Sequence, residues 1–186
     1  MECYHGVVSM DHGISGQLTR DGQTIDFTDG KGYIEKDWGK QFPSAWIWGQ
    51  SNHLTKPGIS LMMSVVVIPC LGGTFGGFIV SLLHGGVIHR FATYNRSKID
   101  SLKVHGGNLD LMLHNRTHRL SIHASKKKGV ILQAPTTNEM DRRIIETLDA
   151  QLDIRFETRG GVLIYQGSGF HGGLEVVGDM NQLLDK

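Results

Sequence analysis

The sequence has few of the features that mark secreted, membrane-spanning or nucleic-acid-binding proteins. Its two cysteines, Cys3 and Cys70, are too few for a disulfide framework, so we expect two free thiols. Its longest apolar run, 59–71, is shorter than the about 20 residues that a membrane-spanning helix needs. The first residues show no basic segment followed by an apolar one, so we expect no signal peptide and a cytoplasmic protein. A net charge of +1 gives no electrostatic reason to expect nucleic-acid binding.

Several catalytic motifs are missing as well. His114, His118 and His123 lie close together in the chain, but strand alternation puts them on no common face, and no Cys-x-x-Cys or His-Glu-x-x-His accompanies them. The residues around Ser168 lack the Gly-x-Ser-x-Gly spacing of serine hydrolases. The glycine pairs around Phe75 do not form a nucleotide-binding Gly-x-Gly-x-x-Gly unit. We therefore expect no metal site, no serine nucleophile and no nucleotide.

Glycine is the abundant residue, at 25 of 186, which is about twice its usual share. Glycine at this level without a repeat is typical of turns, bulges and strand corners. Turn signals recur along the chain and separate short alternating or β-branched segments, from 4–10 to 174–177. We therefore expect a single all-β domain over residues 1–186, an antiparallel β-barrel or strongly curved sandwich of about ten to twelve short strands.

The segment 138–148 departs from this pattern. It has apolar residues at positions 140, 144, 145 and 148, which is helical spacing, and Asn138 could cap the helix. We expect a short helix here, with an irregular loop leading into a strand as the alternative.

The stretch from Gly30 to His53 holds all three tryptophans and a carboxylate–lysine–carboxylate run. If it forms two strands, alternation puts acids on one face of the first strand and aromatic and amide side chains on one face of the second. Such a combination predicts the wall of a pocket. The two sets are Tyr33, Glu35 and Asp37, then Trp46, Trp48, Gln50 and Asn52.

Glu35 and Asp37 are the candidate general acids. A carboxyl group held against aromatic walls loses solvent, which raises its pKa and lets it donate a proton near neutral pH. The alternative is that both are surface acids beside Lys36 and Lys40. The tryptophans allow two interpretations as well, as ring faces that stabilise a carbocation or as ordinary core residues. They are Trp38, Trp46 and Trp48.

A second polar cluster combines Arg142, Arg143 and Glu146 with apolar neighbours. In the functional interpretation one of these residues lies at the pocket mouth and orients a phenol or quinol oxygen. In the alternative interpretation the arginines are surface residues in a salt bridge with Glu139 or Glu146.

The segment from Gly32 to Asn52 resembles the signature of the tocopherol cyclase family. In that signature a Tyr-x-Glu-Lys-x-Trp-Gly run is followed by Phe-Pro-x-x-Trp-x-Trp-x-Gln-x-Asn. Weaker likeness continues through 132–135, 140–143 and 173–178, so it covers most of the chain. The resemblance implies a lipocalin-like β-barrel. Because full-length members have two such halves, it also implies that this chain corresponds to the C-terminal half.

The resemblance implies an activity too. The plant and cyanobacterial enzymes of this family close the chromanol ring of vitamin E on a prenylated hydroquinone: the alkene is protonated and the phenolic oxygen traps the tertiary cation. No redox cofactor is needed, so we expect none. The implied partner is a lipophilic small molecule, which is compatible with peripheral contact with a membrane. The implied roles are proton donation by Glu35 or Asp37, cation-facing walls from Trp38, Trp46 and Trp48, and substrate binding by Tyr33, Gln50, Asn52 and Arg143.

Two other functions fit the same residues. A non-catalytic module could hold a prenylated or other lipophilic molecule without converting it. An isoprenoid hydratase could protonate the same alkene and let water trap the cation.

Overall fold

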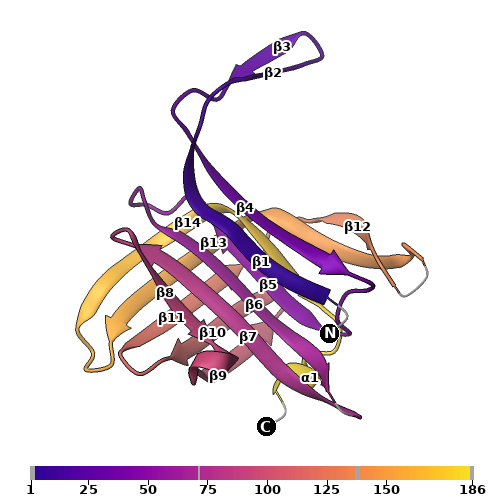
Figure 1. Cartoon of the computed structure of the whole chain (residues 1–186), viewed down its shortest axis with the longest axis vertical. Helices are drawn as coiled ribbons and strands as arrows, with labels where there is room; N and C mark the ends of the chain where they lie inside the picture. Colours follow the sequence, from indigo (N-terminus) through magenta and orange to yellow (C-terminus); the bar gives the residue numbers. More distant parts are fainter. Residues whose placement is uncertain (1–2, 71, 137–138, 185–186) are drawn as a thin grey trace.

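The computed structural model describes residues 3–70, 72–136 and 139–184, and it is almost entirely antiparallel β-structure. Ten strands form one large sheet, and two smaller two-stranded sheets accompany it (Figure 1). In spatial order the large sheet contains β8 (Val87–Ala92), β7 (Gly73–His84), β6 (Ser60–Cys70), β5 (Trp46–Ser51), β14 (Leu163–Val177), β13 (Arg142–Thr158), β11 (His118–Ser125), β10 (Asn108–His114) and β9 (Lys98–His105), while β12 (Val130–Ala134) pairs with β13.

The large sheet is curled, but it is not a closed barrel. Its end strands, β8 and β9, do not pair with each other within the described residues. The curl nevertheless brings β8 close to the loop between β10 and β11, where Asn115 Nδ2 donates a hydrogen bond to the Arg90 carbonyl at 3.4 Å. The rings of His89 and His118 lie 5.0 Å apart between their centroids. Of the two architectures that the sequence allows, the strongly curved one is present.

The concave face of the sheet is filled by aliphatic and aromatic side chains, which form the main core. Alternate residues of a strand point to opposite faces, so Leu61, Met63 and Val65 of β6 enter this core, while Ser64 and Val66 face the outer side. The largest side chains of the core are fully buried and come from most strands of the large sheet. They include Phe91, Leu111, Leu113, Leu120, Leu152 and Phe156.

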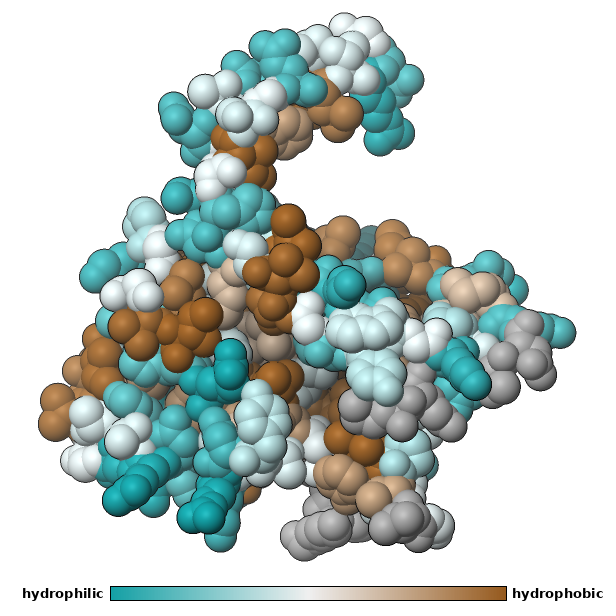
Figure 2. Space-filling view, in the orientation of Figure 1, coloured by the Kyte–Doolittle hydropathy of each residue, from teal (hydrophilic) through white to brown (hydrophobic). Residues whose placement is uncertain are grey.

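A long ribbon crosses the outer face of the sheet. It pairs β1 (Cys3–Ile14) with β4 (Gly30–Gly39) and continues into an arm, β2 (Gln17–Arg20) and β3 (Gln23–Asp26), that projects away from the body (Figure 1). The hairpin turn predicted at 20–22 lies at the tip of this arm. Figure 2 shows apolar side chains exposed on the arm and on the body beneath it. Cys3 in the ribbon and Cys70 at the end of β6 are both free thiols, as predicted.

Several strands are longer than the short strands we expected. β14 runs from Leu163 to Val177 without interruption and includes the glycine-rich segment 166–173. The reason is crowding: a Cβ on Gly167 would collide with the Tyr165 hydroxyl, and one on Gly172 with a methyl group of Leu152. These glycines permit close packing inside a strand instead of ending it.

The helix expected at 138–148 is wrong for the residues that the structure describes. Asn138 lies outside them, and from Arg142 onward the chain is β13, hydrogen-bonded to β12 on one side and β14 on the other. The helical spacing of apolar residues does not correspond to a buried face, since Ile145 and Leu148 are about half exposed. The described helices are the short α1 (Asn181–Leu184) and the 3-10 turn η1 (Thr93–Asn95). No helix in this part of the chain is long and apolar enough to cross a membrane.

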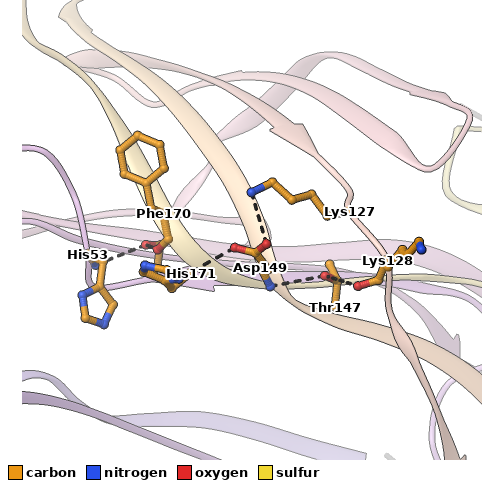
Figure 3. A network of polar contacts seen from close by, with 8 residues as sticks. His53, Lys127, Lys128, Thr147, Asp149, Phe170 and His171 are labelled. Atoms are coloured by element: carbon orange, nitrogen blue, oxygen red, sulfur yellow. Dashed lines mark hydrogen bonds and ion pairs between the residues drawn. The ribbon is translucent and has the colours of Figure 1, made fainter.

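A β-bulge at 147–150 determines which side chains of β13 point into the core and which point to the outer side of the sheet. Figure 3 shows Asp149 in this bulge, with one carboxylate oxygen 3.1 Å from Lys127 Nζ and the other 3.7 Å from His171 Nδ1. The bulge adds one residue to β13 relative to β14, which reverses the alternation. As a result, Glu146 faces the outer side, while residues of the same parity from 150 onward enter the core.

Candidate active site

A cavity of about 660 Å³ lies between the β1–β4 ribbon and the outer face of β5, β6, β7, β13 and β14. This is within the range of small-molecule sites. Most of its lining is apolar or aromatic, and its charged groups are one histidine and four carboxyl side chains. The residues that bear on its chemistry are Cys3, Tyr4, His5, Glu35, Asp37, Trp38, Phe42, Trp46, Trp48, Ser64, Thr93, Glu146 and Glu175.

One face of the ribbon supplies two of the acids, Glu35 and Asp37. In the register of the ribbon His5 lies opposite Asp37, and Val7 lies opposite Glu35. Residues two apart in a strand share a face, so Glu35 and Asp37 look into the same space, as the alternation predicted. The Tyr33 hydroxyl donates a hydrogen bond to a carboxylate oxygen of Glu35.

Glu35 has the environment of a proton donor. Burial raises the pKa of Glu35, and this outweighs the opposing effects of the Tyr33 hydroxyl, the charge of His5 and the indole of Trp48. The Trp48 N–H contributes to holding the charge, although its geometry falls short of a full hydrogen bond. Burial and the bond to Glu35 also raise the pKa of Tyr33, which keeps its hydroxyl protonated.

Asp37 is held by His5, whose Nδ1 lies 2.7 Å from Asp37 Oδ1. A carboxylate only accepts hydrogen bonds, so Nδ1 carries the proton and Nε2 is the remaining ring nitrogen. Burial alone would lower the pKa of His5, but the hydrogen bond to Asp37 and the charges of Asp37 and Glu35 raise it overall. His5 Nε2 is buried and has no hydrogen-bond partner.

His5, Glu35 and Asp37 also carry ligand atoms of the kinds that bind metal ions. Within the described residues they are the group of metal-binding side chains whose ligand atoms lie within 4.8 Å of one another. The hydrogen bond between His5 and Asp37 already accounts for this proximity. We assign no metal to this group.

The floor of the cavity is a row of side chains that crosses four neighbouring strands. The registers place Ser64 of β6 opposite Trp48 of β5, Trp48 opposite Glu175 of β14, and Glu175 opposite Glu146 of β13. The Trp48 ring lies directly over Gly173, where a Cβ would come within 2.5 Å of it. The sheet therefore carries an aromatic ring and two acids side by side on its outer face.

Glu175 and Glu146 are two site residues to which sequence reasoning gave little weight. Trp46 Nε1 donates a hydrogen bond to Glu175 Oε2 at 2.5 Å. Burial raises the pKa of Glu175 despite this bond, and burial also raises the pKa of Glu146. Glu175 was never singled out, although it lies in the segment 173–178 on which the family resemblance partly rests. The sequence signal that could have revealed Glu175 is a single carboxyl side chain among glycine, leucine and valine residues of an apolar strand.

His5 was missed altogether. A lone histidine near the start of a strand carries no sequence signal of its own. Only its register opposite Asp37 reveals its place in the site.

The three tryptophans all line the cavity, but in different ways. Trp46 is only 5% exposed, and Trp48 is half-buried beside it. Trp38 is 49% exposed and stacks on Tyr4, with ring centroids 5.5 Å apart and planes 13° apart. Lys36 Nζ lies 4.7 Å from the Trp38 ring. Trp46 and Trp48 therefore form inner walls, and Trp38 forms an outer one.

The two amide side chains of the predicted site lie outside the cavity lining. Gln50 is on the same face of β5 as Trp48, one step further along, and its Oε1 is buried without a hydrogen-bond partner. Asn52 lies beyond the end of β5 and is half-buried.

Arg143 is exposed on β13 and is not brought to the cavity. Its neighbour Arg142 makes the contacts instead. The Arg142 guanidinium lies 4.7 Å from the Trp46 ring and donates two hydrogen bonds of 2.6 Å to the carbonyls of 43–44. Arg142 thus supports the wall formed by Trp46 from outside.

The chain is similar to several known proteins. The tocopherol cyclase-like family model matches residues 4–178. The chain is 28% identical to the chloroplastic tocopherol cyclase of Zea mays over 140 residues, and 27% identical to a probable chloroplastic tocopherol cyclase of Oryza sativa subsp. japonica. Each of these alignments covers 71% of this chain and 29% of the relative.

Among solved structures, kievitone hydratase from Nectria haematococca has a similar fold, with a TM-score of 0.51 at 9% identity. The match covers 95% of this chain and 53% of that one. This chain therefore spans about half of its structural neighbour and less than a third of its plant relatives. The family match covers nearly all of the chain, so the protein belongs to the tocopherol cyclase-like family.

Proposed function

We propose that this protein closes a chromanol ring on a prenylated hydroquinone, with the Glu35 carboxyl protonating the prenyl double bond. The observation that carries the proposal is a half-buried carboxyl with a raised pKa on an apolar cavity walled by tryptophans. Membership of the tocopherol cyclase-like family supports the same reaction class.

Glu35 suits the role of donor better than Asp37 does. Asp37 is already engaged in a hydrogen bond with His5, and its side chain is 35% exposed to solvent. Glu35 is less solvated, and its bond from the Tyr33 hydroxyl orients one carboxyl oxygen. A donor must be protonated and correctly placed at the working pH, and a raised pKa satisfies the first of these conditions.

The aromatic walls suit the cation that follows protonation. Ring faces attract positive charge, so Trp46 and Trp48 on the cavity wall suit a cation that forms beside them. The reaction is then an isomerisation: the alkene gains a proton at carbon, a C–O bond forms, and the phenol loses its proton.

Hydration of an isoprenoid is the second candidate. Ser64, Thr93, Glu146 and Glu175 put polar atoms on the cavity wall, where they could hold a water molecule near the cation. The kievitone hydratase neighbour bears a hydratase name, but at 9% identity that likeness concerns the fold alone.

The test is to incubate the purified protein with a prenylated hydroquinone and identify the product by chromatography and mass spectrometry. A chromanol of unchanged mass supports the cyclase, and a gain of one water supports the hydratase. Tight retention of unchanged substrate would replace both with a binding module.

The variant Glu35→Gln keeps the shape and removes the proton. We expect turnover to fall by about 10²–10⁴-fold while the ligand still binds, because general acid catalysis typically contributes that much. Glu139→Gln makes the same chemical change at an exposed position outside the cavity, and it should turn over like the wild type. Full activity in Glu35→Gln would contradict the assignment of the donor.

A further inference from the structure

The site contains a second titratable unit, the hydrogen-bonded pair of His5 and Asp37. Ring closure needs such a unit, because the acid that protonates the alkene is left as a carboxylate and the phenol must lose a proton. A site that returns the phenolic proton to the acid can complete a cycle without exchanging protons with solvent.

We propose that His5, held by Asp37, accepts the proton released by the nucleophilic hydroxyl and passes it back to Glu35. The inference rests on the proposed function. In the first step the Glu35 O–H bond breaks and the proton forms a C–H bond with the electron pair of the alkene. In the second step the hydroxyl oxygen forms the C–O bond, and its proton goes to Nε2 of His5. In the third step the His5 imidazolium returns this proton to the Glu35 carboxylate.

The hydrogen bonding of His5 leaves one atom for this task. Nδ1 is fixed on Asp37 at 2.7 Å, so Nε2 is the acceptor, and it is buried without a partner. A buried polar atom without a partner costs free energy, so a ligand hydroxyl that supplied one would be favoured at this point. One ligand atom of each of His5, Glu35 and Asp37 lies within 4.8 Å of the other two, so the His5 ring and the Glu35 carboxylate are close enough for the proton to return through one bridging hydroxyl or water molecule.

Asp37 acts through His5 and is a positioning residue. Its carboxylate selects the tautomer with the proton on Nδ1 and stabilises the imidazolium that forms when Nε2 accepts a proton. Its register directly opposite His5 in the ribbon fixes the ring.

The surface of the protein offers a matched control. His114 Nδ1 lies 2.7 Å from Asp100 Oδ1, and these side chains are 20% and 30% exposed, close to the 17% and 35% of His5 and Asp37. The His114–Asp100 pair does not line the cavity. If the His5–Asp37 pair serves only the fold, substitutions in it should therefore have the same effect on turnover as substitutions in the His114–Asp100 pair.

The experiment compares His5→Gln and Asp37→Asn with His114→Gln, using the 186-residue chain in each case, a prenylated hydroquinone and thermal unfolding as a check on folding. We expect His5→Gln to lose about 10²-fold or more in kcat with unchanged ligand affinity. Asp37→Asn should lose less, and His114→Gln should match the wild type.

The pH profile separates a proton acceptor from a structural residue. In the active form Glu35 holds one proton and His5 Nε2 is free, so adding or removing a proton stops turnover and the wild-type profile is bell-shaped. Asp37→Asn removes a negative charge, which lowers the pKa of His5 and moves the bell toward lower pH. His5→Gln removes the group whose protonation stops turnover at low pH and keeps only Glu35 of the two, so the acid limb of the profile disappears. Asp37 and Glu35 interact with His5 directly. The other titratable groups on the elements around it are Cys3 and Tyr4 of the ribbon and Glu146 and Glu175 of the sheet, which line the same cavity, and Tyr33, which is hydrogen-bonded to Glu35.

Three results would overturn the proposal. The first is wild-type kcat in His5→Gln while Glu35→Gln is inactive, which leaves the proposed function intact. The second is a bell that does not move in Asp37→Asn. The third is turnover that EDTA abolishes and a divalent ion restores, since the three side chains would then serve a cation. If the wild type itself gives no product, the proposed function fails and the relay fails with it.

Discussion

Consecutive residues of β5 lie on opposite faces of the sheet, and the two faces have very different surroundings. Ile47, on the inner face, enters a core of aliphatic and aromatic side chains that is closed to solvent. Trp46 and Trp48, on the outer face, border a cavity shared with four carboxyl groups and a histidine. The buried core and the proposed chemistry therefore belong to opposite faces of the same strands. The comparison teaches that a substitution can address one without the other.

The largest effect on stability is expected on the inner face. Leu111 is completely buried in the main core and does not line the cavity. Leu111→Ala should lower the free energy of unfolding by about 2–5 kcal/mol, because it removes buried methyl groups and leaves a cavity. Denaturant unfolding measures the loss, and the folded fraction should bind a prenylated hydroquinone as the wild type does. A loss below about 1 kcal/mol would mean that the core is looser than its burial indicates.

An intermediate effect is expected where the outer face is most tightly packed. A Cβ on Gly173 would lie 2.5 Å from the Trp48 ring, so Gly173→Ala must displace that ring. We expect a loss of about 1–3 kcal/mol of stability, a changed tryptophan fluorescence spectrum and weaker ligand binding. Gly13→Ala in β1 meets nothing within 4 Å and provides the control. Unchanged fluorescence and affinity in Gly173→Ala would show that Trp48 does not shape the cavity.

The smallest effect on stability is expected at Glu175, a carboxyl group on the outer face of the sheet, and this effect depends on pH. Glu175→Gln keeps an oxygen for the Trp46 N–H but cannot ionise. Burial raises the pKa of Glu175 in the folded state. The contribution of the protonated Glu175 side chain to stability is therefore fully present below the ordinary carboxyl pKa of about 4.3, and it is lost as the pH rises through the raised pKa of the folded state.

The Tm of Glu175→Gln should therefore equal that of the wild type near pH 4 and exceed it increasingly as the pH rises. Thermal unfolding from acidic to mildly alkaline pH measures the difference, with Glu139→Gln as the exposed control. A Tm difference that shrinks with rising pH would mean that ionised Glu175 is stabilising.

Much of the fold could be predicted from the sequence, and the exceptions have physical reasons. Alternation and turn signals predicted an all-β chain, and the structure has one. The helix predicted at 138–148 is wrong for the described residues. Apolar spacing alone does not show that the segment beginning at Arg142 is a strand paired with β12 on one side and β14 on the other. Glycine was expected to mark turns, bulges and strand corners, whereas Gly167 and Gly172 lie inside β14, where contacts with Tyr165 and Leu152 leave no room for a Cβ.

The candidate site was predictable where its residues are neighbours in sequence. Glu35 and Asp37 share a face because they lie two residues apart in one strand, and Trp46 and Trp48 repeat that relation in the next. His5 could not be found this way, since it joins the site only by pairing opposite Asp37, 32 residues further along.

The sequence by itself determined the β-structure, the family, and the side chains that each of the strands β4 and β5 presents on one face. It could do so because alternation is a property of consecutive residues. Only the tertiary structure decided that the ribbon crosses the outer face of the sheet, that the sheet curls without closing, and that a bulge turns Glu146 outward beside Glu175. Those outcomes depend on contacts between segments far apart in the chain, and the pKa values of the carboxyl groups depend in turn on the burial that those contacts create.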